Sequence, residues 1–225
     1  MAHWRRAVGR RPGATVLLLL LAAAVLLGVA VGAGLLVSRV EPGTEVADLD
    51  AGTDEWLADH RVPALNAASG TFAELGNTPV VIGVGLVAAA TALAVARHWR
   101  PAVFIVGALV GELVIFLTTT TLIDRPRPPV PHLDAQLPPT SSFPSGHTAA
   151  AICLYGGIAA LVLTATRAWW RWLVLAAAVL VVLVVAGARL YRGAHYPTDV
   201  LGSVLFALPW LIVVHRLVLP DARSR

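Results

Sequence analysis

The sequence contains no lysine, one cysteine and few charged residues of either sign. Charged residues make up 13% of the 225 positions and hydrophobic residues 57%, whereas soluble domains have about 25% and about 45–50%. These proportions exclude a soluble globular domain, and the high hydrophobicity excludes a disordered chain. Because Cys153 is alone, it excludes an intramolecular disulfide and a cysteine-based metal site, and we expect it to be a small core residue.

Six apolar runs are long enough to cross a hydrocarbon core of about 30 Å, which takes about 17–25 residues. They cover residues 14–37, 79–96, 102–121, 148–166, 172–188 and 200–219. The arginine-rich prefix of the first run is typical of a signal peptide, but the run is long and has no convincing cleavage site, so we interpret it as a retained span. We therefore predict an all-α fold, a six-span membrane helical bundle in which residues 1–225 form a single domain.

The arginines predict how this bundle is oriented. Of the 17, 11 fall before the first run, in the second and fourth loops, or after the last run. By the positive-inside rule this side is cytoplasmic and holds both termini, so the net charge of +4 reports orientation rather than a nucleic-acid partner. The acidic segment 38–78 then faces outward, and we expect it to be a partly helical loop without chemistry. The loops 123–147 and 189–199 face the same side.

Six arginines lie on the outer side, where the positive-inside rule disfavours them, and four of these are unusual: Arg125, Arg127, Arg189 and Arg192. Guanidinium groups bind phosphate through paired N–H donors, so an anion site is the natural explanation. The alternative is that they bind lipid head groups.

Two histidines lie near these arginines in the sequence. Residues 143–148 read Phe-Pro-Ser-Gly-His-Thr and directly precede the fourth run, where the free N–H groups of a helix start bind anions and His147 would lie beside the anion. Asp199 follows His195 by four residues, and Gly193 permits a tight turn between the fifth and sixth runs. A carboxylate that accepts one ring N–H fixes the tautomer and leaves the other nitrogen as a nucleophile or base. The sequence thus predicts a phosphoryl-transfer site.

These residues resemble the type 2 phosphatidic acid phosphatase family, membrane lipid phosphatases that share their site with vanadium haloperoxidases. The family signature has three parts: Lys-x6-Arg-Pro, Pro-Ser-Gly-His and Ser-Arg-x5-His-x3-Asp. This sequence has Arg127 followed by proline, Pro-Ser-Gly-His at residues 144–147, and Arg189 with His195 and Asp199 at the family spacing.

Two positions depart from the signature. Thr120 stands where the family has lysine, and Ala188 stands where it has serine. Threonine cannot supply a cation, so one phosphate contact is lost or is supplied by Arg125 or Arg192. The change at Ala188 removes a hydrogen bond.

The resemblance implies a role for each matching residue. His195 attacks phosphorus and forms a phosphohistidine, Asp199 holds its ring, and His147 acts first as acid and then as base. The phosphoryl oxygens are held by Arg127, Ser145, Gly146 and Arg189. Arginines and a helix start supply the positive field, so the resemblance implies no metal and no other cofactor.

Three further residues carry polar groups near this site or inside a span. His132 and Asp134 lie in the intervening loop, and we expect them to be part of the loop structure rather than ligands. Glu112 is a charged residue well inside a span, and such residues are functional candidates by default. An equally weighted alternative is that Glu112 is a structural group packed between helices.

The function that the resemblance implies is hydrolysis of a lipid phosphate at the outer face of a membrane, in a bacterium the plasma membrane. Phosphatidate, phosphatidylglycerol phosphate and polyprenyl diphosphates are all family substrates, and the sequence does not choose between them or between monoester and diphosphate. Transfer of the phosphoryl group to another alcohol is an alternative. A second is a non-catalytic lipid carrier or assembly partner with a degenerate anion site. The oligomeric state is left open.

Overall fold

The computed structural model describes residues 12–39, 44–135 and 137–219. In these residues all regular secondary structure is α-helical, so the predicted all-α fold is confirmed. The helices are α1 (Pro12–Ser38), α2 (Glu45–Asp59), α3 (Pro63–Glu74), α4 (Thr78–Ala96), α5 (Arg100–Leu122), α6 (Gly146–Ala165), α7 (Arg171–Tyr191) and α8 (Pro197–Val218).

Six of these helices, all except α2 and α3, have the length and composition needed to cross a membrane. They match the six predicted spans, and the protein is a multi-pass membrane protein. The ends of the observed helices differ from those of the predicted spans by a few residues, because some helices extend over polar residues at their ends. Because α6 begins at Gly146, α7 ends at Tyr191 and α8 begins at Pro197, His147, Arg189 and Asp199 all belong to terminal helical turns.

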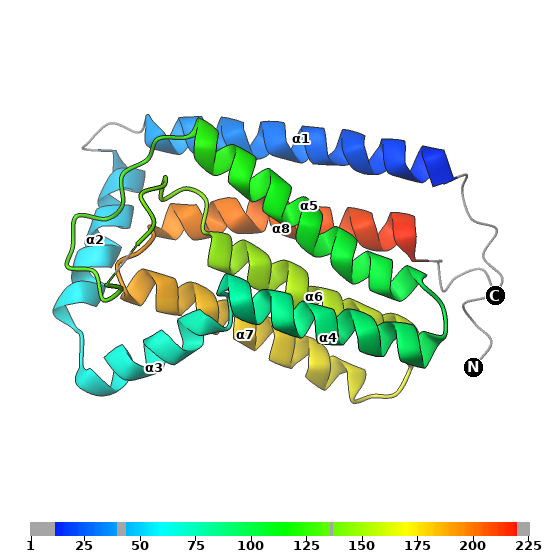
Figure 1. Ribbon diagram of the computed structural model, residues 1–225. Helices are drawn as coiled ribbons and strands as arrows, with labels where there is room; N and C mark the ends of the chain where they lie inside the picture. Colours follow the sequence, from blue (N-terminus) through cyan, green and yellow to red (C-terminus); the bar gives the residue numbers. More distant parts are fainter. Residues whose placement is uncertain (1–11, 40–43, 136, 220–225) are drawn as a thin grey trace.

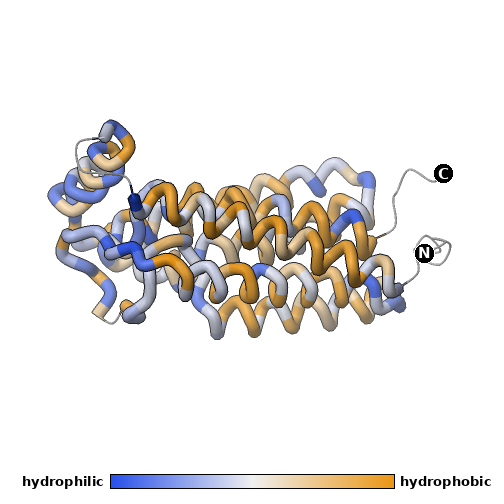
Figure 2. The backbone as a smooth tube through the Cα atoms, turned by 90° about the horizontal axis from the view of Figure 1, so that it is seen from above, coloured by the Kyte–Doolittle hydropathy of each residue, from blue (hydrophilic) through white to orange (hydrophobic). Residues whose placement is uncertain are grey.

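The six long helices run along a common direction, and α2, α3 and the loop between α5 and α6 gather at one end (Figure 1). We call this the site end. The start of α1 and the end of α8 lie at the opposite end. Figure 2 shows hydrophobic residues along the middle of the bundle and hydrophilic residues concentrated at its two ends, as a bilayer requires. Which end faces the cytoplasm stays a prediction.

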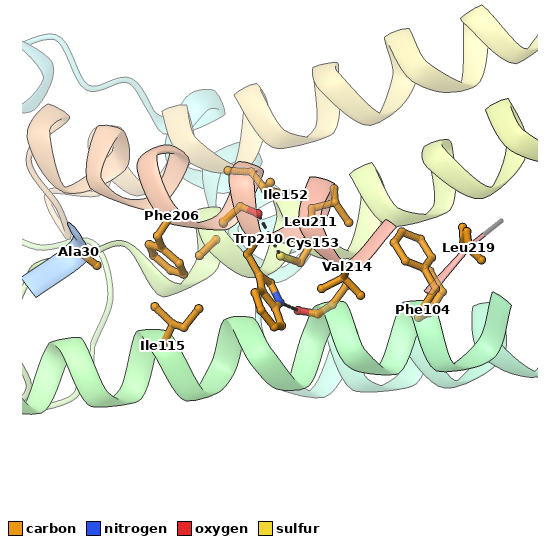
Figure 3. Close-up of a cluster of buried hydrophobic side chains, with 14 of the residues drawn as sticks. Ala30, Phe104, Ile115, Ile152, Cys153, Phe206, Trp210, Leu211, Val214 and Leu219 are labelled. Atoms are coloured by element: carbon orange, nitrogen blue, oxygen red, sulfur yellow. Dashed lines mark hydrogen bonds between the residues drawn. The ribbon is translucent and has the colours of Figure 1, made fainter. Parts of the chain in front are cut away.

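The core of the bundle lies between α5, α6 and α8 (Figure 3). The indole Nε1 of Trp210 in α8 donates to the carbonyl of Ala108 in α5 at 3.0 Å. Gly111 permits this approach, because a Cβ there would lie 1.9 Å from the indole ring. Cys153 is fully buried in this core, as expected for a small packing residue.

The acidic segment forms α2 and α3, which cover the site end beside α7 and α8. The Thr44 side chain caps α2, and Pro63 starts α3. Two carboxylates of α2, Asp50 and Asp54, are 3% and 1% exposed, so this segment does more than form a solvated loop.

Candidate active site

A cavity of about 850 Å³ opens at the site end. It is lined by five of the seven site residues that the sequence predicted: Arg127, Gly146, His147, Arg189 and His195. They come from the α5–α6 loop, the start of α6, the end of α7 and the α7–α8 turn. Residues distant in the sequence therefore share one cavity, as a catalytic site requires.

His195 is held in a defined orientation by the turn between α7 and α8. Gly193 makes this turn with φ of +72°, a left-handed conformation that glycine adopts without strain. The His195 Nδ1 atom lies 2.7 Å from the carbonyl oxygen of Ser142. A carbonyl only accepts, so Nδ1 carries the proton and Nε2 keeps its lone pair.

The charge state of His195 follows from the groups around it. Burial lowers the pKa of the imidazole, and the neighbouring Arg189 and Arg127 lower it further, whereas Asp199 acts in the opposite direction. The net effect is a lowered pKa, so the ring is neutral near pH 7. A neutral ring with a protonated Nδ1 leaves Nε2 as the nucleophilic atom.

Asp199 lies behind this imidazole in the first turn of α8 and is fully buried. Its Oδ2 atom is 3.6 Å from His195 Nδ1 and accepts the backbone N–H of Tyr196 at 2.9 Å. The sequence led us to expect this carboxylate to accept the ring N–H, but the Ser142 carbonyl is the closer acceptor. Asp199 therefore interacts with the same nitrogen electrostatically, in addition to the hydrogen bond to Ser142.

Arg127 and Arg189 supply positive charge to the cavity. Arg127 donates from Nη1 to the carbonyl of Ala194 at 2.7 Å, and Arg189 donates from Nη1 to Asp134 at 2.8 Å. In both side chains the buried Nε–H has no hydrogen-bond partner among the described residues. Burial and the proximity of Arg189 lower the pKa of Arg127. Unpaired donors and mutual repulsion both favour an anion between the two guanidinium groups.

The segment before α6 is fixed by a phenylalanine. Phe143 is 1% exposed, and its ring occupies the space over Gly34 and Gly202, where a Cβ would lie under 3.0 Å away. This contact ties the start of α6 to α1 and α8. Gly146 in turn packs against Phe116, whose ring would lie 2.7 Å from a Cβ at this position.

His147 and Ser145 differ in what they face. His147 lines the cavity, and no side-chain hydrogen bond joins it to another described residue. Ser145 is fully buried, and its hydroxyl is 3.0 Å from the hydroxyl of Thr148. It does not line the cavity, so its contact with phosphate stays a prediction, whereas Gly146 does line it.

The position where the family has lysine is occupied here by an uncharged residue. Thr120 does not line the cavity, and its hydroxyl is 3.5 Å from the Ser141 carbonyl. Arg125 lies outside the cavity and is paired with Asp50 and Asp199. Of the two arginines that could replace the lysine, Arg192 is the one at the cavity.

Arg192 is already engaged by several partners. Its Nε donates to Asp134 at 2.6 Å, its Nη2 to the Leu133 carbonyl at 2.9 Å, and its Nη1 to the Ser69 hydroxyl at 3.2 Å. Arg192 therefore also joins α3 to the α5–α6 loop.

Asp134, which we expected to be part of the loop structure rather than a ligand, lines the cavity. Its carboxylate bridges Arg189 at 2.8 Å and Arg192 at 2.6 Å. Burial alone would raise the pKa of Asp134, but the two arginines outweigh this and lower it. No motif marks an aspartate in a long loop, so only its proximity to Arg127 in the sequence could have suggested it. His132 has a loop role, as expected, with Nε2 3.0 Å from the Pro128 carbonyl.

Residues 119–222 match the sequence model of the PAP2 superfamily. The chain is also similar to two solved structures. One is a transmembrane PAP2-type phosphatidylglycerolphosphate phosphatase from Bacillus subtilis, at 22% identity and a TM-score of 0.68, over 90% of this chain and 93% of that one. The other is LpxE from Aquifex aeolicus, at 24% identity and a TM-score of 0.58, over 78% of this chain and 98% of that one.

No curated protein matches the chain significantly. The family match and the shared fold confirm the resemblance to the type 2 phosphatidic acid phosphatase family that the motifs indicated. Within the described residues, no group of three or more histidine, cysteine, aspartate or glutamate side chains could hold a metal ion.

Proposed function

We propose that this protein is an integral membrane lipid phosphatase that hydrolyses a lipid phosphomonoester or diphosphate through a phosphohistidine intermediate. The observation that carries the proposal is the setting of His195. Its Nδ1–H is directed to the Ser142 carbonyl at 2.7 Å, and its ring lines a cavity beside two arginines with unpaired Nε–H groups. A neutral imidazole next to unpaired phosphate ligands suits attack on phosphorus.

The first step transfers the phosphoryl group to the protein. His195 Nε2 attacks phosphorus in line, the bond from phosphorus to the lipid oxygen breaks, and His147 donates its proton to that oxygen. His195 becomes positively charged as the new bond forms, and Asp199 at 3.6 Å stabilises this charge. His147 suits the acid role because no described side chain occupies its ring nitrogens.

The phosphoryl oxygens need positive partners throughout this step. Arg127 and Arg189 donate to them, and the backbone N–H of Gly146 at the start of α6 adds a helix-terminus contact. These groups are fixed before the substrate arrives, so little reorganisation is needed as charge spreads over the oxygens. We include Ser145 as a fourth ligand, although its hydroxyl must first turn away from Thr148.

The second step releases phosphate. His147, now neutral, takes a proton from water, the water oxygen attacks the phosphohistidine, and the bond from phosphorus to Nε2 breaks. Inorganic phosphate leaves, and both histidines return to their starting protonation states.

The whole chain acts as one membrane domain in this proposal. The phosphate enters the cavity at the site end, and the hydrophobic tail stays among the lipids around the bundle. We place this end at the outer face of a bacterial plasma membrane. The positive-inside rule supports that orientation, because the arginine-rich loops lie at the opposite end.

The test is phosphate release by the detergent-purified protein from a panel of lipid phosphates and diphosphates, with EDTA present. We expect release, and we expect His195→Ala to reduce it at least ~10³-fold. The matched control is His98→Ala, because His98 lies between α4 and α5 at the opposite end of the bundle. A protein that binds these lipids but releases no phosphate, with or without added metal ions, would instead be a carrier.

A further inference from the structure

Glu112 is a buried carboxylate that the mechanism above does not use. It lies in the middle of α5, is 4% exposed and lines the cavity. No hydrogen bond or ion pair joins its side chain to any described residue. A carboxyl group in the apolar part of a membrane protein is costly unless it meets a polar partner. The described residues supply none, which indicates a partner that enters the cavity.

The depth of Glu112 relates it to the phosphate site. Phe116 packs against Gly146, at the helix start that holds the phosphate. Glu112 precedes Phe116 by four residues on the same helix, which places it about 6 Å deeper at a rise of about 1.5 Å per residue. This distance corresponds to the first two or three carbon atoms that follow the phosphate in a lipid.

Close to Glu112, the cavity wall includes a residue that is also on the outer surface of the bundle. The next residue, Leu113, lines the cavity and is also 46% exposed on the surface of α5. A tail that leaves the cavity beside Leu113 reaches the membrane, and the polar region of the lipid then lies between Glu112 and the arginines.

We propose that Glu112 is a specificity residue that hydrogen-bonds a hydroxyl group on the carbon atoms next to the scissile phosphate. A hydroxyl suits a carboxyl group in either protonation state, because a carboxylate accepts its proton and a carboxylic acid can also donate. The favoured substrates are lipid phosphates that carry a hydroxyl near the phosphate. Polyprenyl phosphates, which have only hydrocarbon at this depth, would leave the carboxyl group without a partner. This inference rests on the proposed phosphatase function.

The test compares two substrates that differ only in this hydroxyl: oleoyl lysophosphatidate and oleoyl propanediol phosphate. We expect the wild-type protein to prefer the first by about tenfold or more in kcat/KM, because the second leaves a buried polar group unpaired. Glu112→Leu should lower kcat/KM for lysophosphatidate to the level of the deoxy substrate and change that of the deoxy substrate little. Glu112→Gln keeps an acceptor and should retain most of the preference.

A matched control is available in the same cavity. Glu74 also lines it, but its Oε2 already accepts from the Asn77 amide at 2.9 Å. We expect Glu74→Gln to leave the hydroxyl preference unchanged. An active wild-type protein without the preference overturns the inference and needs no variant to do so. A preference that survives in Glu112→Leu, or an equal loss on both substrates, also overturns it. Absence of phosphate release from every lipid overturns the proposed function itself and this inference with it.

Discussion

Two arginine–carboxylate clusters at the site end use the same chemistry in different surroundings. The rear cluster consists of Asp50, Arg125 and Asp199, and the cavity cluster consists of Asp134, Arg189 and Arg192. The rear side chains are 4%, 9% and 0% exposed and none lines the cavity, whereas all three members of the cavity cluster line it.

The difference separates two uses of arginine. In the rear cluster Arg125 connects α2 to α8, because it binds Asp50 at 2.7 Å and also Asp199 and the Thr198 hydroxyl. Its guanidinium also lies 4.3 Å from the centre of the Tyr196 ring. None of these groups lines the cavity. In the cavity cluster Asp134 occupies arginine donors that a phosphate could take instead, so this contact is exchangeable.

The largest effect should come from breaking the rear cluster. Arg125→Leu leaves two carboxylates buried without their cation, and we expect it to lower the free energy of unfolding by about 3–5 kcal/mol. The measurement is thermal unfolding in detergent, with Arg192→Leu as the control, since Asp134 would keep Arg189 as a partner. Equal stability losses in the two variants would contradict the distinction between the clusters.

Removal of Arg189 from the cavity cluster should affect turnover more than stability. We expect Arg189→Leu to lower kcat/KM about 10²-fold or more, because in the proposed mechanism this arginine binds the phosphoryl oxygens. Its unfolding temperature should change little, because Asp134 stays paired with Arg192. Steady-state kinetics and unfolding of the same preparation check both parts. A variant that unfolds early but turns over normally would assign Arg189 to the scaffold.

Asp134→Asn should have a smaller effect and should strengthen phosphate binding, whereas Arg189→Leu weakens it. The carboxylate competes with phosphate for Arg189, so its neutralisation should tighten inhibition by inorganic phosphate about threefold to tenfold. Because the pKa of Asp134 is lowered, the wild-type carboxylate is ionised at neutral pH and competition is complete there. Weaker inhibition in the variant would instead show that Asp134 holds the arginines in position.

A pH-dependent effect concerns Asp54, which lies beside the rear cluster and whose two carboxylate oxygens have no hydrogen-bond partner among the described residues. Burial, and then repulsion by Asp50 and Asp199, raises its pKa from 3.8 to about 7. Between these values the folded state keeps a proton that the unfolded state has lost, so stability falls as pH rises, by at most about 1.4 kcal/mol per pH unit.

Asp54→Asn replaces the titrating carboxyl group with a neutral amide and should flatten that part of the profile. The variant should be more stable than the wild-type protein at pH 8 and about equal to it below pH 4. Unfolding temperatures across this pH range, with exposed Glu55→Gln as the control, measure the difference. Identical profiles for Asp54→Asn and wild type would contradict it.

The sequence was sufficient for the elements that physical rules specify locally. Uncharged runs predict membrane helices because a bilayer demands apolar side chains and internal hydrogen bonds. Motif spacing brought His147, Arg189 and His195 to one cavity, since each lies at a helix end.

Contacts that depend on tertiary packing could not be predicted from the sequence. The Ser142 carbonyl as the acceptor for His195 depends on how the loop before α6 is folded, and no residue type encodes it. The same is true of Asp50, which belongs to an acidic segment that reads as solvated loop but binds Arg125 across the bundle. Long-range pairs of this kind arise from the docking of α2 on α8.

The most direct test of the central claim is to trap the phosphorylated protein. His147→Asn lacks the base for the second step, so an ester with a good leaving group, which needs no acid, should load the protein and stop there. Rapid quenching at neutral or alkaline pH followed by peptide mass spectrometry should find the phosphoryl group on His195. A phosphoryl group on any other residue, or rapid turnover with no trapped species, would contradict the mechanism.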